Sequence, residues 1–234
     1  MNSKITNAQG LSAWPIFIAL FLPFAASFFY FVFFTDSFFA QLMYFGAKLF
    51  TVIWPLVVWK YVWRCDLPSA RLLRPVGGDI FWGLTIGSLI VVAMVFAMGT
   101  QVGDVVIGST PAIRAKVESL GVMNYYIPFA IFISVLHSLI EEYYWRLFVF
   151  GGLRKIAPPA LAHILAAIGF SLHHFVVLGQ YFPMWLAFTL GSFVGLGGLI
   201  WSLLFQRQNT LAGIWLSHML VDFGILGIGY FLLF

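Results

Sequence analysis

Seven long apolar segments dominate this 234-residue chain and leave few folds open to it. A bilayer core about 30 Å thick is crossed by roughly 20 apolar residues in an α-helix. The segments that reach this length are 12–34, 38–62, 79–99, 124–151, 159–178, 182–205 and 211–233. We therefore predict an all-α protein, a polytopic membrane helix bundle of about seven transmembrane helices that forms a single transmembrane domain over 1–234.

The composition supports a membrane protein and excludes two other classes. Only 9% of the residues are charged and 62% are hydrophobic, with a mean hydropathy of +0.99, whereas a soluble domain carries about 25% charged residues. A soluble globular protein is excluded, and the lipid bilayer is an expected partner. The 12 Lys and Arg residues form no basic stripe, which excludes nucleic-acid binding. Cys65 is the only cysteine, so neither an internal disulfide nor a cysteine-based zinc cluster can form.

Loop charges predict the orientation of the bundle. With seven spans, one side collects Lys4, Lys60, Arg64, Arg71, Arg74, Arg154, Lys155 and Arg207. The other side holds only Arg114 and Lys116. Because cytoplasmic loops carry the excess of Lys and Arg, we predict a cytoplasmic N-terminus and an outside C-terminus. The expected location is the plasma membrane (the inner membrane in a bacterium), which the chain would cross several times.

The segment between the third and fourth spans has the pattern of a short surface helix. Thr110 followed by Pro111 suits an N-cap and the first helical position. One apolar stripe then follows, formed by Ile113, Val117 and Leu120, with Gly121 as a stop. We expect an amphipathic helix on the outer membrane surface; the alternative is an ordinary connecting loop.

Ionisable residues inside the spans gather in the second half of the chain. Each costs about 2.5–3.5 kcal/mol at a helix centre, so they are the informative positions. They are Glu141, Glu142, Arg146 and Asp222 together with the histidines His137, His163, His173, His174 and His218. Away from their ends, the first three spans contain only Lys48. This asymmetry predicts a functional core built from helices four, five and seven.

In the fourth helix, the spacing separates two neighbouring glutamates. Glu142 lies four residues before Arg146, so the two charges share a face and offset each other. Glu141 lies about 100° around the axis and lacks that partner, which suits a general base or acid. The alternative is that both glutamates only hold helices together. His137 could orient Glu141 from one turn away, although a packed histidine is the simpler interpretation.

The fifth and seventh helices contribute the other candidate residues. Phe170 and His174 share a face, and His173 points about 100° away. We expect only one of the two histidines to face a common site, and periodicity does not choose between them. His218 and Asp222 stack on one face of the seventh helix. Asp222 could fix the tautomer of that imidazole, or donate a hydrogen bond if it is protonated.

Three motifs follow each other along the chain: Glu-Glu-x-x-x-Arg (141–146), Phe-x-x-x-His (170–174) and His-x-x-x-Asp (218–222). In this order on successive apolar helices, they resemble the motifs of the CPBP intramembrane protease family. That family includes CaaX-processing endopeptidases of prenylated proteins and bacterial bacteriocin-processing and self-immunity proteases. The resemblance covers roughly 124–225. It implies a CPBP-like catalytic helix core over 123–234. The preceding part, 1–122, would be a variable region with helices one to three and the outer amphipathic segment.

The resemblance also assigns roles to residues. It implies that Glu141 and His174 activate a water molecule, and that His218 and Asp222 stabilise the oxyanion of a tetrahedral intermediate. The supporting residues would be Glu142, Arg146 and Phe170. Many family members have Asn where this chain has Asp222. Because an ionised aspartate would repel an oxyanion, Asp222 is expected either to be protonated or only to orient His218.

The function predicted is that of an intramembrane endopeptidase, which hydrolyses a peptide bond in a membrane-associated protein or hydrophobic peptide. No Gly-x-Ser-x-Gly motif is present and no cysteine lies within a span, so a covalent mechanism has no obvious nucleophile. His-Glu-x-x-His is also absent. We expect no cofactor; the alternative is a divalent metal such as zinc on Glu141, His174 and His218.

Two other functions use the same residues. A proton-coupled membrane transporter could employ them as a relay, although the chain has no internal inverted repeat of the kind found in many transporters. A non-catalytic peptide-binding immunity protein would need the fold without the chemistry. The intact motifs favour the protease.

Overall fold

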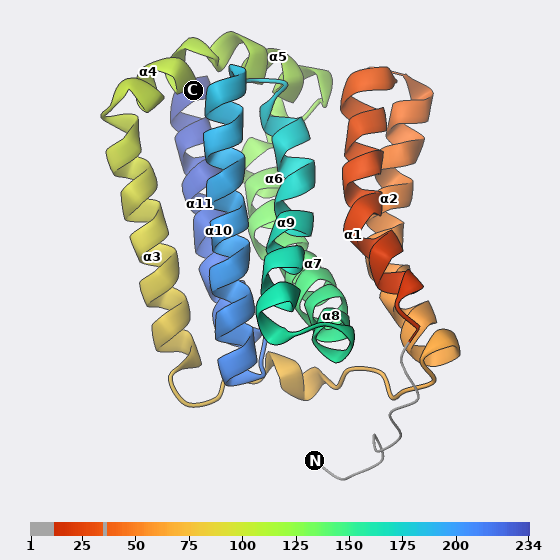
Figure 1. Ribbon diagram of the computed structural model, residues 1–234. Helices are drawn as coiled ribbons and strands as arrows, with labels where there is room; N and C mark the ends of the chain where they lie inside the picture. Colours follow the sequence, from red (N-terminus) through yellow and green to blue (C-terminus); the bar gives the residue numbers. More distant parts are fainter. Residues whose placement is uncertain (1–11, 35–36) are drawn as a thin grey trace.

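The computed structural model describes residues 12–34 and 37–234, and these residues form helices and connections without any β-strand (Figure 1). Within these ranges, seven helices are long and apolar enough to cross a membrane: Trp14–Phe33, Phe38–Val62, Asp79–Met98, Met123–Ile156, Pro159–Leu178, Met184–Gln208 and Ala212–Leu233. The predicted all-α fold with seven spans is confirmed, and the chain is a multi-pass membrane protein. The largest difference in bounds lies at the end of the fourth span, which continues to Ile156.

The N-terminal half supplies a helical hairpin and a third span. Its elements are α1 (Trp14–Phe28) with the π-helical turn η1 (Phe29–Phe33), α2 (Phe38–Val57) with η2 (Val58–Val62), the 3₁₀ turn η3 (Ala70–Leu73) and α3 (Asp79–Met98). The side-chain oxygen of Ser37 accepts a hydrogen bond from the backbone N–H of Ala40 and so caps α2. The hairpin α1–α2 lies beside the remaining helices in Figure 1.

The fourth span alternates between α-helical and π-helical turns. After the 3₁₀ turn η4 (Met123–Tyr125) it consists of α6 (Tyr126–Phe132), η5 (Ile133–His137), α7 (Ser138–Glu142), η6 (Tyr143–Phe150) and α8 (Gly151–Ile156). The last three spans are regular helices, α9 (Pro159–Leu178), α10 (Met184–Gln208) and α11 (Ala212–Leu233). Wide π turns are rare and often mark functional sites, and here they flank the two neighbouring glutamates of α7 on both sides.

The surface segment after the third span contains two helices, where the sequence predicted one. They are α4 (Gln101–Gly108) and α5 (Thr110–Ser119), which lie across the end of the bundle that also holds the C-terminus (Figure 1). The predicted helix is confirmed, but Ser109 flanks its start and Thr110 is already helical. Gly121 has a φ of 68°, the left-handed conformation expected of a helix stop. Arg114 ties α5 to α11 by donating a hydrogen bond to the carbonyl oxygen of Leu233.

Basic residues gather at one end of the bundle, in the connection 63–78 (Arg64, Arg71 and Arg74) and in the last turns of α8 (Arg154 and Lys155) and α10 (Arg207). The connections 63–78, 157–158 and 209–211 lie at the lower end in Figure 1, opposite α4 and α5. The charge asymmetry that predicts orientation therefore corresponds to the two ends of the folded molecule. The orientation itself stays a prediction.

Small residues allow α3 and α11 to pack closely and so fix the place of α11. A Cβ atom on Gly83 would collide with the backbone carbonyl of Gly213, and one on Gly87 would come within 3.0 Å of the carbonyl oxygen of Ser217. Close approach of backbones at small residues is typical of helix packing in membranes. These contacts place His218 relative to the rest of the bundle.

The α3–α11 contact predicts a stability difference between two glycine substitutions. Gly83→Ala should lower the free energy of unfolding by about 1–3 kcal/mol, because the new methyl group forces apart two backbones in contact. Gly46→Ala is the matched control: Gly46 lies within α2, and a Cβ atom added to it would have no neighbouring atom within 4 Å. That variant should be neutral or more stable by up to about 1 kcal/mol. Unfolding titrations of the purified variants would measure both, and equal effects would contradict the contact.

Candidate active site

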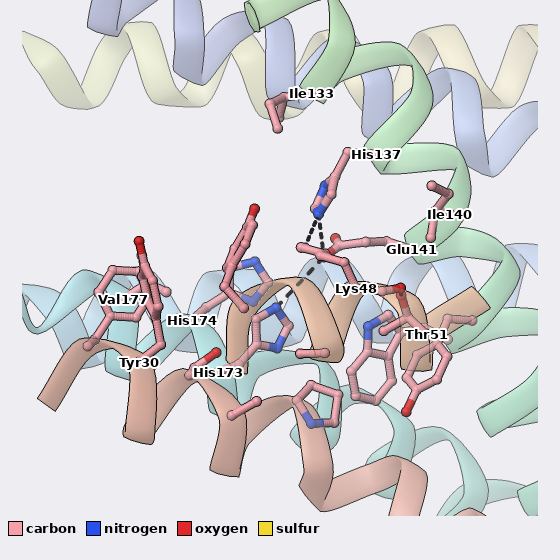
Figure 2. A pocket seen from close by; sticks show the side chains of 18 residues that line it. Tyr30, Lys48, Thr51, Ile133, His137, Ile140, Glu141, His173, His174 and Val177 are labelled. Carbon is pink, nitrogen blue, oxygen red and sulfur yellow. Dashed lines mark hydrogen bonds and ion pairs between the residues drawn. The ribbon is translucent and has the colours of Figure 1, made fainter. Parts of the chain in front are cut away.

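A cavity of about 290 Å³ lies between the hairpin α1–α2 and the helices α7 and α9 (Figure 2). The hairpin lines it with Pro23, Ala26, Ser27, Tyr30, Phe31, Tyr44, Ala47, Lys48 and Thr51. The other wall comprises Ile133, His137, Ile140, Glu141, Tyr144, Trp145, His173, His174 and Val177. All of these residues belong to membrane-spanning helices. The cavity is therefore inside the bundle, with polar groups concentrated around one glutamate.

Three imidazoles from three spans surround the carboxylate of Glu141. Its Oε1 atom lies 3.7 Å from Nε2 of His137 and 3.8 Å from Nε2 of His173, and its Oε2 atom lies 3.8 Å from Nε2 of His218. These separations exceed direct hydrogen-bonding distance, so the carboxylate keeps the capacity to accept hydrogen bonds from a water molecule. Glu141 does lack Arg146 as a partner, as predicted, but it is not isolated, because neighbouring helices supply protonatable groups.

Glu142 forms a buried network on the neighbouring face of α7. Its Oε2 atom lies 3.0 Å from Nε of Arg146, and both side chains are at most 1% exposed. Its Oε1 atom accepts a hydrogen bond of 2.7 Å from Nδ1 of His218. The guanidinium carbon of Arg146 lies 4.8 Å from the centre of the Phe170 ring and 5.4 Å from that of Trp201. The predicted Glu142–Arg146 pair is present, and it also reaches the seventh span.

His218 is held on two sides. Its ring stacks on Trp201 at 4.4 Å between ring centres. Its Nδ1 atom must carry the proton in the bond to Glu142, because an ionised carboxylate can only accept. Nε2 therefore faces Glu141 and lies 3.7 Å from Oδ1 of Asp222. The sequence left open whether Asp222 fixes this tautomer or donates a hydrogen bond, and in the structure the partner of Nδ1 is Glu142.

Both neighbouring histidines of α9 line the cavity, so the expectation that only one of them could face it is wrong. Their ring centres are 4.0 Å apart. His174 donates from Nδ1 to the carbonyl oxygen of Phe170 at 2.9 Å, which leaves Nε2 with a free lone pair. The ring of His173 stacks on Trp145, and its Nε2 atom is the one close to Glu141. The side chains of His173 and His174 point about 100° apart around α9, but the cavity borders this helix over a wide arc, so both side chains reach it.

Lys48 is the site residue that motif analysis missed. It extends from α2 into the cavity, and its Nζ atom forms a hydrogen bond with Nε2 of His137 (Figure 2). The available signal was its isolation, since the other charged residues of the first three predicted spans, Lys60 and Asp79, lie at span ends. A contact between two distant helices leaves no periodic trace in the sequence.

The alternative metal site is not assembled in the structure. Over residues 12–34 and 37–234, no group of three His, Cys, Asp or Glu side chains is arranged to hold a metal ion. In the set considered, Glu141, His174 and His218, the Nδ1 atoms of both imidazoles already have partners, so each ring would have only Nε2 left to offer a metal ion.

Comparison with known families finds a match over residues 123–224. The family that matches is that of Rce1-like type II CAAX prenyl endopeptidases, and this part of the chain is a domain of that family. The match contains all three motifs and confirms the predicted resemblance to within one residue at each end. Helices α1 to α5 lie outside it. No curated protein and no solved structure matched the chain.

The buried network predicts a large stability effect at Glu142. Glu142→Gln should lower the free energy of unfolding by about 3–5 kcal/mol, because it leaves the charge of Arg146 buried without its counter-charge. The matched control is Glu118→Gln, which changes an exposed glutamate of α5 in the same way and should alter stability by less than about 0.5 kcal/mol. Replacing both Glu142 and Arg146 by leucine should recover much of the loss. Chemical unfolding of purified protein would measure this series, and a neutral Glu142→Gln would contradict it.

Proposed function

We propose that the protein is an intramembrane endopeptidase that hydrolyses a peptide bond in a membrane-associated protein or hydrophobic peptide. The observation that carries the proposal is the Glu141 carboxylate, 3.7–3.8 Å from three imidazoles inside a cavity of the bundle. The Rce1-like domain supports it, because that family consists of proteases. Peptide hydrolysis in a membrane needs a base for water, a donor for the oxyanion and a protected cavity.

In the proposed mechanism Glu141 is the general base. A water molecule held against its carboxylate gives up a proton, and the water oxygen attacks the carbonyl carbon of the scissile bond. His174 is proposed to hold the same water, because its Nδ1 atom is committed to Phe170 and Nε2 can accept a hydrogen bond. When the C–N bond breaks, the proton on Glu141 passes to the leaving amine. No covalent intermediate forms.

His218 is proposed to stabilise the oxyanion. Since Nδ1 donates to Glu142, the ring can offer Nε2–H to a negative oxygen only while it carries both protons. The carboxylates of Glu141, Glu142 and Asp222 lie around it and offset that positive charge. In this arrangement Asp222 acts on His218 and need not touch the oxyanion. Glu142, Arg146 and Phe170 are then positioning residues that fix the imidazole.

The first experiment compares two glutamate variants on a panel of peptides. The panel contains an internally quenched farnesylated peptide with a CAAX end, its unprenylated form, and an apolar transmembrane peptide. Wild-type protein and Glu118→Gln should cleave at least one of them. Glu141→Gln should lose at least about 100-fold in kcat, the lower range for loss of a general base, with unchanged thermal stability. Equal cleavage by Glu141→Gln would contradict the role of Glu141. Proton-linked flux in liposomes without cleavage would favour a transporter.

The adjacent histidines of α9 provide a matched pair for the second experiment. His174→Ala should abolish measurable cleavage, whereas His173→Ala should retain part of it. The reason is that His174 has a fixed tautomer with a free Nε2 atom and also occupies the motif position. Rates for both purified variants on the peptide cleaved by wild type would decide. A greater loss in His173→Ala would transfer the proposed water-holding role to His173, whose Nε2 atom lies nearer Glu141.

A further inference from the structure

Lys48 places a charged group in the candidate active site from outside the Rce1-like domain. Among the described residues that line the cavity, it is the only lysine or arginine. It belongs to α2, far from the matched residues 123–224 in the sequence. A lysine within a membrane span costs about 2.5–3.5 kcal/mol on insertion scales and marks a functional position by default. Its partners therefore indicate what it does.

The ammonium group of Lys48 has a specific partner in the fourth span. Nζ forms its hydrogen bond with Nε2 of His137, and the ring of Tyr44 lies 5.4 Å from the same atom. An ammonium group can only donate, so Nε2 of His137 is the acceptor and the proton of the neutral imidazole is on Nδ1. The same Nε2 atom lies 3.7 Å from Oε1 of Glu141. Lys48, His137 and Glu141 thus form a chain of neighbours, visible in Figure 2.

We propose that Lys48 is a positioning residue for Glu141, acting through His137. This inference rests on the proposed function, in which Glu141 is the base. The hydrogen bond from Lys48 fixes the orientation and tautomer of His137, and the ring then borders one oxygen of the carboxylate. The ammonium group of Lys48 and the carboxylate of Glu141 line the same cavity and carry opposite charges. Each therefore offsets part of the cost of burying the other.

The hairpin α1–α2 is attached so that Lys48 can reach the core. The hydroxyl of Tyr144 donates to the carbonyl oxygen of Ala19 at 2.8 Å, and that of Tyr143 donates to the carbonyl oxygen of Val52 at 3.2 Å. Both tyrosines directly follow the paired glutamates in the fourth span. The segment that carries the proposed base therefore also holds the hairpin that carries Lys48, and the two parts build one site.

The test compares the same substitution at two lysines of α2 and its π-helical extension. Lys48→Met should lower kcat by about 10- to 100-fold, a part of the roughly 10²–10⁴-fold that a positioned general base contributes. KM should change by less than about twofold, and Lys48→Arg, which can still donate to His137, should retain more activity than Lys48→Met. Lys60→Met is the control, because Lys60 is exposed in η2, and it should match wild type. Each rate is measured on the panel peptide that wild type cleaves.

Thermal stability separates positioning from a structural role. Glu141 keeps the imidazoles of His137, His173 and His218 as neighbours when Lys48 is replaced, so the melting temperature of Lys48→Met should stay close to that of wild type while its kcat falls. A parallel loss of melting temperature and activity would overturn the proposal, as would a kcat within twofold of wild type.

A double-mutant cycle tests the route through His137. If Lys48 acts through that ring, the kcat of the double variant Lys48→Met with His137→Asn should lie within about twofold of the kcat of the less active single variant. Multiplicative losses would overturn the proposed route. Failure of the proposed function would look different, because wild type itself would then cleave no peptide of the panel.

Discussion

The free-energy cost of charge inside a membrane determines how this site is built. An ionisable side chain at the centre of a span must be compensated by partners that the bundle brings to it. Glu142 has Arg146 and His218, Glu141 has imidazoles from three spans, and Lys48 has His137. Because each charge is compensated by a residue of another turn or another helix, the arrangement that permits chemistry also holds the helices together.

The site does not follow the division of the sequence into a family domain and a preceding region. Residues 123–224 supply the glutamates and the histidines. The hairpin α1–α2 supplies half of the cavity wall and Lys48, and tyrosines of the family domain hold it in place. The division into 1–122 and 123–234 thus remains a prediction about the sequence. For the cavity, both parts act as one unit.

Sequence reasoning recovered the features that depend on one helix at a time. Bilayer thickness sets span length, and a four-residue spacing brought Glu142 to Arg146. Contacts between helices were harder to predict, because they depend on how separate helices are turned toward each other. Three such contacts were missed: Lys48 with His137, His173 with Glu141, and Glu142 with Nδ1 of His218. The π turns on both sides of α7 and the extra helix α4 were also missed, since a uniform 3.6-residue period predicts neither.

The central claim is that water reaches a carboxylate enclosed within the membrane bundle, and thiol reactivity in native membranes tests it most directly. In a Cys65→Ser background, Ala47→Cys would place a thiol on the cavity wall, and Leu49→Cys would place one two residues away at a position 43% exposed on the outer surface of the same span. Only a thiol in contact with water forms the reactive thiolate readily. We expect a small hydrophilic methanethiosulfonate reagent to modify Ala47→Cys quickly and Leu49→Cys slowly. An unreactive Ala47→Cys would contradict the account.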